Sequence, residues 1–374
     1  MDRKVGRSWL SMLALFGLVA LIAAGCGGGG GGGTTSAAEP EGSTSSEEGA
    51  SESAPVEVAF KSFETGLPNC YSEPKPGNAT IAYVSPTAAN EVLTYQAEGV
   101  KRETERLGGK FVLADGEGEP DKQVAAVQRL LAQGVDAIVI YPLDPAALGP
   151  VLKQAQQKGV PVVGVQVNSE SEKIPPEFDT QVLLQNGKIG YLEAEAISQL
   201  VPAGSELGEI GFAVPVPAIE YILKSAKHYA EEFGLKVVAR SNNPTDDIAG
   251  GEVAMTQLLG EAPNIAGVIS YSDPTAAGAH SVTRAQNKEV AFVSEGGDSV
   301  GINSIESGTL GATVQIPMVA SGACAARGAF DLIEGQKLPE SVKAGEPVLL
   351  TPETIDELPT WEEQLDAIAK EGYK

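Results

Sequence analysis

Short apolar strands alternate with amphipathic helices through most of this 374-residue chain. The apolar runs predict two series of strands: 81–84, 111–114, 137–140 and 160–167, then 207–214, 235–239, 266–270 and 290–293. Glycines such as Gly134 and Gly159 end the helices between them. A run that is apolar throughout, such as 137–140, is typical of a strand buried on both faces. The pattern therefore predicts parallel sheets with helices on both faces.

One unit of this pattern occurs twice. Residues 137–147 and 266–277 each contain a buried strand, a tyrosine at its carboxyl end, and an Asp-Pro pair that opens an alanine-rich helix. We expect Asp144 and Asp273 to cap these helices, because Asp is a preferred N-cap and Pro suits the first helical position. Ligand contact is the alternative, and the two roles are compatible because strand ends and helix starts line the ligand crevice of such sheets.

The N-terminus has the organisation of an export signal. A basic segment precedes an apolar run at 10–24 that is too short for a membrane span, and Ala23-Ala24-Gly25-Cys26 resembles a bacterial lipobox. We therefore predict a lipoprotein signal peptide over 1–26, with Cys26 as the lipidated residue that anchors the chain to a membrane surface. A signal peptide without lipidation is the alternative.

Residues 27–78 are predicted to be a flexible tether rich in Gly, Ser and Glu, since they offer little apolar surface to offset ordering entropy. Cys70 and Cys324 are the cysteines left after Cys26. In an exported protein such a pair most simply forms one disulfide, and two buried free thiols are the alternative.

Charge and composition exclude several functions. The chain has 26 Lys and Arg against 50 Asp and Glu, a formal net charge of −24, which excludes nucleic acid as a partner. The only histidines, His228 and His280, cannot form a His-rich metal site and argue against nucleophile–His–Asp catalysis. No glycine loop suited to a phosphate follows a strand. We therefore expect no cofactor, no metal and no enzyme activity.

Several segments resemble the sugar-binding proteins of ABC importers of the ribose/galactose type. The similarity is densest at 121–142 and 159–163, continues at 305–315, and covers about 80–360. It implies an α/β fold of two doubly wound, Rossmann-like lobes joined by a three-segment hinge, with the ligand in the cleft between the lobes.

The resemblance also implies boundaries. Lobe 1 should comprise 79–185 plus 316–340, and lobe 2 should comprise 186–315 plus 345–374. The crossings between the lobes should lie near 184–187, 315–317 and 338–347.

The positions that carry the sugar contacts in this family differ here. Gln166-Val167 stands in place of an Asp-Arg pair, Tyr221 stands near an expected Arg, and Ser272 replaces an Asn. Glu295 lies beside an expected Asp, and Gln315 matches the family. No tryptophan is available for the pocket. These changes predict a more neutral pocket, less suited to a bare sugar.

The side chains expected at the cleft follow strand ends. They are Asn90, Asp115, Tyr141, Gln166, Tyr221, Ser272, Asp273, Glu295 and Gln315. Gln166 is the leading candidate. Tyr141 has the alternative of a core-edge aromatic, Asp115 that of a turn former, and Glu295 that of a solvated loop residue.

Together these features predict an exported lipoprotein, anchored on the outer face of the cytoplasmic membrane, that captures a small polar solute by hinge closure. The resemblance implies an ABC permease as its partner, a sugar-like ligand and a monomeric state. A surface receptor subunit that signals to a membrane sensor is the alternative function, and an enzyme is a remote one.

Overall fold

The computed structural model describes residues 66–168 and 172–374. The predicted signal peptide, the predicted lipidation site at Cys26 and most of the predicted tether lie outside the described residues. In the described part of the chain, no helix is long and apolar enough to cross a membrane. That same part contains no group of His, Cys, Asp and Glu that could hold a metal ion.

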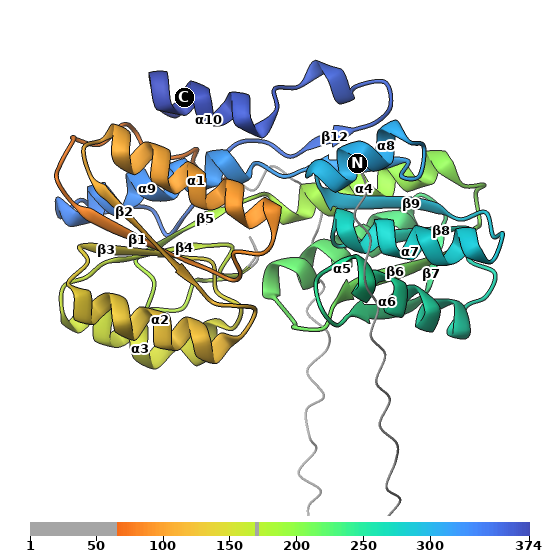
Figure 1. Cartoon of the computed structure of the whole chain (residues 1–374), viewed down its shortest axis with the longest axis horizontal. Helices are drawn as coiled ribbons and strands as arrows, with labels where there is room; N and C mark the ends of the chain where they lie inside the picture. The colour runs from red at the N-terminus through yellow and green to blue at the C-terminus, as the bar shows by residue number, and fades with distance from the viewer. Residues whose placement is uncertain (1–65, 169–171) are drawn as a thin grey trace, which may run out of the picture. The chain divides into compact units, whose positions relative to one another are not determined.

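The first sheet, with its helices, forms lobe 1. Its strands run in the order β11-β5-β4-β3-β1-β2 and pair in parallel. They are β1 (Thr80–Ser85), β2 (Lys110–Asp115), β3 (Ala137–Ile140), β4 (Val162–Val165), β5 (Thr180–Leu183) and β11 (Ser341–Lys343). The helices are α1 (Glu91–Arg106), α2 (Pro120–Gln133), α3 (Pro145–Gln157) and α9 (Met318–Ile333). Figure 1 shows α1 and α9 on one face of this sheet and α2 and α3 on the other.

The second sheet, with its helices, forms lobe 2. Its strands run in the order β12-β10-β9-β8-β6-β7, and only β12 is antiparallel to its neighbour. They are β6 (Glu206–Phe212), β7 (Lys236–Asn243), β8 (Gly267–Ser270), β9 (Ala291–Gly296), β10 (Ala312–Gln315) and β12 (Val348–Leu350). The helices are α4 (Asn186–Leu200), α5 (Pro217–Glu232), α6 (Ile248–Glu261), α7 (Asp273–Ala285) and α8 (Ser299–Glu306).

Alternation along the central strands explains why each sheet is covered on both faces. Successive strand residues point to opposite faces, so Ile138 of β3 enters the core under α2 and α3 while Val139 enters the core under α1 and α9. In β8, Val268 packs toward α6 and α7, and Ile269 packs toward α4 and α5. Each lobe therefore has a core on both sides of its sheet, as the fully apolar strands predicted.

The chain passes between the lobes at 184–185, 316–317 and 344–347, close to the expected crossings. Strand β5 and helix α4 flank the first crossing, and neither element was among those expected from the apolar runs. Strand β7 extends to Asn243, beyond the expected end at 239, because a polar and partly exposed edge strand lacks the apolar signal of a central one.

The C-terminal residues were assigned to lobe 2, and this assignment is wrong for the last helix. Helix α10 (Trp361–Glu371) packs on α1 and α9 of lobe 1, so the chain crosses once more through 351–360. Trp361, Leu365 and Ile368 share one helical face and bury against Val319 and Ala323 of α9. This apolar stripe places α10 on lobe 1. The chain therefore crosses between the lobes four times rather than the expected three.

The predicted tether also ends earlier than expected, because residues 66–78 pack against lobe 1. The Tyr71 hydroxyl lies 2.6 Å from Thr180 Oγ1, and Asn69 forms an isolated bridge with Lys343. Cys70 and Cys324 form a disulfide with their Cα atoms 5.6 Å apart.

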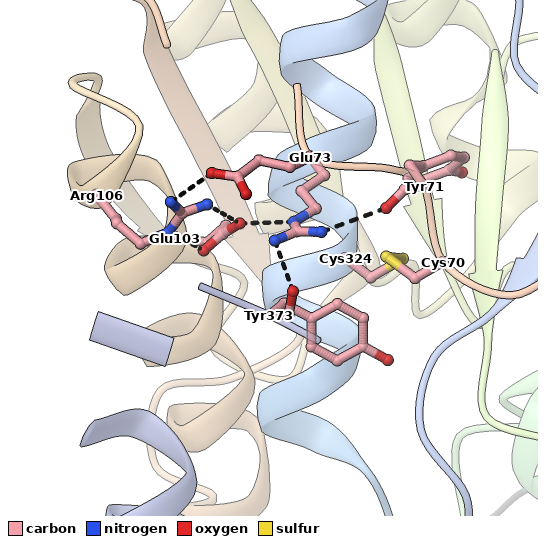
Figure 2. Close-up of polar contacts among 8 residues, drawn as sticks. Cys70, Tyr71, Glu73, Glu103, Arg106, Cys324 and Tyr373 are labelled. Atoms are coloured by element: carbon pink, nitrogen blue, oxygen red, sulfur yellow. Dashed lines mark hydrogen bonds and ion pairs between the residues drawn. A yellow bond between two sulfur atoms is a disulfide. The ribbon is translucent and has the colours of Figure 1, made fainter. Parts of the chain in front are cut away.

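Next to this disulfide, a buried ion pair joins α9 to α1. Arg327 Nε donates to Glu103 Oε1 at 2.6 Å, and its Nη2 donates to the carbonyl oxygen of Tyr373 at 2.7 Å (Figure 2). Arg106 donates to the same Glu103 carboxylate and to Glu73. These side chains therefore join the segment before β1, helices α1 and α9, and the C-terminus.

Candidate functional site

A cavity of about 470 Å³ lies at the carboxyl ends of the strands of both sheets and is lined from both lobes. Lobe 1 contributes polar side chains that follow β1, β2, β3 and β4, which are Asn90, Glu117, Tyr141 and Gln166. Lobe 2 contributes side chains at or after β6, β7, β8 and β9, which are Phe212, Asp246, Asp247, Tyr271, Ser272 and Glu295. Parallel strands bring their carboxyl ends to one edge of a sheet, which is why residues so distant in sequence meet here.

Apolar side chains complete the cavity wall. They come from helices and crossing segments that face it, and include Leu93, Leu184, Ile189, Ile219, Ile222, Ile316 and Met318. Such a lining, mostly apolar with a few convergent polar groups, is typical of a small-molecule site.

Gln166 follows β4 and lies beside the first crossing. Its backbone has a φ of 55°, in the left-handed region, and its side chain is 2% exposed. The side-chain Nε2 donates to Asn186 Oδ1 at 2.5 Å, and Oε1 accepts from the Leu184 backbone N–H at 3.1 Å. Gln166 therefore lines the cavity and, at the same time, joins the end of β4 to the segment that leaves lobe 1.

Asn90 and Asp246 connect the lobes at the cavity. Asn90 is the N-cap of α1, where its Oδ1 accepts from the Leu93 backbone N–H, and its Nδ2 donates to Asp246 Oδ2 at 3.2 Å. The other oxygen of Asp246 accepts from the Tyr271 hydroxyl at 2.7 Å. Burial raises the pKa of Asp246, and these two hydrogen bonds oppose that rise by stabilising the carboxylate.

Glu295, near the end of β9, lines the cavity and is 6% exposed. Its Oε2 is buried without a hydrogen-bond partner among the described residues. Burial, together with the nearby Asp273 carboxylate, raises the pKa of Glu295 to about 8. Burial also raises the pKa of Glu193 on α4, with Glu295 as the next cause. Acidic groups therefore gather behind this wall of the cavity.

Asp273 does not line the cavity, contrary to expectation. Its carboxylate is 1% exposed and accepts from Ser294 Oγ at 2.5 Å and Thr313 Oγ1 at 2.6 Å. It also accepts from the backbone N–H groups of Gly297 and Asp298. These bonds hold the loop after β9 against β10, so the role of Asp273 is to support the cavity wall from behind.

Asp273 is also not the cap of its helix. Ser272 takes that position, and its Oγ accepts from the Thr275 backbone N–H while Ser272 lines the cavity. In the matching unit of lobe 1, Asp144 does cap α3 as predicted, since its Oδ1 accepts from the N–H groups of Ala146 and Ala147.

Three further predicted residues lie outside the cavity. Asp115 accepts from the backbone N–H groups of Ala88 and Glu117, so it orders the two adjoining loops, as its turn-former alternative indicated. Tyr221 lies on the side of α5 that faces α4, while the adjacent Ile222 lines the cavity. Gln315 turns toward α10, where its Oε1 accepts from Gln364 Nε2 at 3.5 Å.

Four further residues line the cavity but were not among those expected: Asp246 and Asp247, which follow β7, and the aromatic pair Phe212 and Tyr271. The end of β7 had been placed at 239, so the loop that carries the two aspartates was not recognised as a strand end. Tyr271 had a usable signal, because it occupies the same place in its repeated unit as Tyr141.

The cavity is acidic rather than neutral. Glu117, Asp246, Asp247 and Glu295 line it, and no Lys, Arg or His of residues 66–168 and 172–374 does so. Phe212 and Tyr271 stack with ring centroids 5.6 Å apart. The site can accept hydrogen bonds and cover a solute with aromatic and aliphatic groups, and its described lining residues offer no positively charged group to an anion.

The fold and the position of this cavity define a two-lobed binding protein, and comparison with known proteins identifies its family. The model of the periplasmic binding protein domain matches residues 81–337, and the chain belongs to this family. Proteins of this family bind solutes outside the cytoplasm and are not enzymes. The chain is accordingly an extracytoplasmic solute-binding protein.

Individual relatives are moderately similar in sequence. The ribose import binding protein RbsB of Bacillus subtilis is 28% identical over 288 residues, which cover 74% of this chain and 92% of the relative. The D-xylose-binding periplasmic protein of Escherichia coli is 27% identical over 250 residues, covering 63% and 72%.

Among solved structures, an ABC transporter solute-binding protein from Bacillus halodurans with bound myo-inositol has a TM-score of 0.67 at 21% identity. That alignment covers 78% of this chain and 99% of the other, and it supports the two-lobed fold.

Proposed function

We propose that this protein captures a small polar solute, of monosaccharide size, between its lobes and delivers it to an ABC permease. The observation that carries the proposal is the cavity of about 470 Å³ to which strand ends of both lobes contribute. A solute held there contacts both lobes at once, so its binding favours the arrangement in which they close on it. Relatives named for ribose and xylose binding, and neighbours named as ABC transporter proteins, support the importer function.

Within this proposal, Asn90, Tyr141, Gln166, Ser272 and Glu295 contact the solute. Asp246 and Tyr271 join them from the loop after β7 and from the end of β8. The crossings at 184–185, 316–317 and 344–347 act as the hinge, with lobe 1 and lobe 2 as the moving bodies.

We also propose that lipid on Cys26 holds the protein, as a monomer, on the outer face of the cytoplasmic membrane. Cys26→Ala should release the protein into the medium or periplasm, and a palmitate label should appear on the parent protein alone. Equal membrane retention of both proteins would rule out this anchor.

Deletion of the gene tests the importer function. Uptake of the solute that stabilises the purified protein should fall, and restoring the gene should recover it. A variant with Asn90→Ala and Tyr141→Ala should not recover uptake, whereas a control with the exposed Gln133→Ala should. Unchanged uptake with loss of a transcriptional response would instead favour the receptor subunit.

A further inference from the structure

Charge in the cavity is one-sided. Glu117, Asp246, Asp247 and Glu295 bring carboxylates to it, and in the described part of the chain no basic side chain lines it. Of these four acids, Glu117 is paired with Lys122, at 2.6 Å, and Asp247 caps α6, whereas Asp246 and Glu295 have no ion-pair partner among the described residues. The cavity's negative charge is therefore not balanced from within its own wall.

Glu295 is the carboxylate for which this imbalance matters most. It is 6% exposed, its Oε2 has no hydrogen-bond partner among the described residues, and the side chain forms part of the cavity wall. A buried carboxylate is costly unless it is paired with a positive group or hydrogen-bonded. The adjacent buried carboxylate, Asp273, has four hydrogen-bond donors, whereas none is available to this oxygen.

Aromatic groups line the same cavity. Phe212 and Tyr271 are stacked, and Tyr141 enters from the other lobe. The Tyr271 hydroxyl is held by Asp246, which keeps the ring in place. Burial raises the pKa of Tyr141, and the carboxylates of Glu295 and Asp246 add to this rise. Carboxylates next to aromatic faces are the combination that binds organic cations through charge and cation–π attraction.

We propose that the solute is a small organic cation, with a protonated nitrogen bound between Glu295, Asp246 and the aromatic rings of Tyr141 and Tyr271. This inference rests on the proposed function and specifies its substrate class. Burial disfavours the ionised form of Glu295 in the empty cavity, so that form needs a positive partner. A neutral hydroxyl group could donate a hydrogen bond to it but would bring no opposite charge. A cation supplies both the missing partner and the opposite charge.

A fractionated pool of solutes tests this class without knowledge of the ligand. The small-molecule part of yeast extract is separated at neutral pH into a fraction retained on a cation exchanger and an unretained fraction. Each is added to the full mature protein in a thermal-shift assay. We expect the retained fraction to raise the melting temperature. Stabilisation by the unretained fraction alone would overturn the cation inference and leave solute capture intact, and stabilisation by neither would contradict both.

Matched variants and probes give the second arm. Glu295→Gln and Asp246→Asn should each lower the affinity for the cation that stabilises the protein in the retained fraction. The expected loss is about tenfold or more, the scale of one desolvated charge contact. Glu209→Gln is the control, because Glu209 is a buried acid of lobe 2 outside the cavity, and it should bind as the parent does. Choline should bind more tightly than its neutral analogue 3,3-dimethyl-1-butanol. Equal affinity of the parent and both cavity variants would refute the inference.

Discussion

At the scale of single residues, the conflict between burial and charge at Glu295 has a measurable consequence. The folded protein raises the pKa of Glu295 from 4.5 to about 8, mainly through burial. Between these values the folded state holds a proton that the unfolded chain releases. The free energy of unfolding therefore falls as the pH rises through this window. Glu193, Asp273 and Asp298, which face the same region, have raised pKa values and act in the same direction.

We predict that the ligand-free protein unfolds at a lower urea concentration at about pH 8 than at about pH 5.5, the two conditions spanning the titration of buried acids. Glu295→Gln should be more stable than the parent at the higher pH and should depend less on pH. The exposed Glu261→Gln serves as the control. A midpoint that rises with pH in the parent would show that Glu295 is ionised in the empty protein.

Gln166 gives a second prediction at this scale. Gln166→Ala leaves Asn186 Oδ1 and the Leu184 N–H without their partner, so the empty protein should lose about 1–3 kcal/mol of stability. A residue that only contacted solute would not change this quantity. Urea unfolding without ligand measures it, with the exposed Gln133→Ala as the matched control, and equal stability of parent and Gln166→Ala would contradict the role at the crossing.

At the scale of elements, identical local patterns lead to different roles. The Asp-Pro pair begins a helix in both repeated units, yet Asp144 caps α3 while Asp273 reaches Ser294 and Thr313. In lobe 2 a serine precedes the aspartate and takes the cap. Helix α10 likewise has the capping box and apolar stripe of an ordinary surface helix, and nothing local indicates which lobe it covers.

Leu365→Ala tests the packing of α10 on lobe 1. Leu365 is 2% exposed in the cluster with Val319 and Trp361, so its truncation should cost about 2–5 kcal/mol. The neighbouring exposed Asp366→Ala should change the stability by less than about 0.5 kcal/mol. Thermal or urea unfolding compares the two variants, and similar values for both would mean that α10 does not pack in this way.

At the scale of the whole molecule, contacts far apart in sequence hold lobe 1 together. The disulfide between Cys70 and Cys324 spans 254 residues, and the Arg327–Glu103 pair lies beside it (Figure 2). A cross-link over so long a loop restricts the unfolded chain more than a short one does. The segment before β1 is thereby fastened to α9.

The double variant Cys70→Ser/Cys324→Ser should lose about 2–5 kcal/mol of stability for this reason. Reduction with dithiothreitol should destabilise the parent and leave the double variant unchanged. Melting temperatures of the two proteins with and without reductant provide the measurement. An equal effect of reductant on both proteins would contradict the stabilising role of this bond.

The central strands and their helices were predictable because a strand buried on both faces is apolar throughout, as at Ala137–Ile140. Asn90, Tyr141, Gln166, Ser272 and Glu295 were expected at the cavity for a related reason, since they lie at the ends of such strands or in the loops that follow them. Asp246 was missed because the edge strand before it is polar. Tyr221 was wrongly expected at the cavity, because successive side chains on a helix of 3.6 residues per turn point about 100° apart. The next residue, Ile222, is the one that lines the cavity.

The sequence alone thus determined the two α/β lobes, the positions of the crossings and the strand ends that reach the cleft. Local periodicity decides the strands and their ends, whereas the two lobes and the crossings follow from the resemblance to a known family. Only the tertiary structure decided that Asp273 supports the wall from behind, that α10 covers lobe 1, and that acids without a balancing cation meet aromatic rings in one cavity. Those outcomes depend on distances between residues far apart in the chain, which no local pattern encodes.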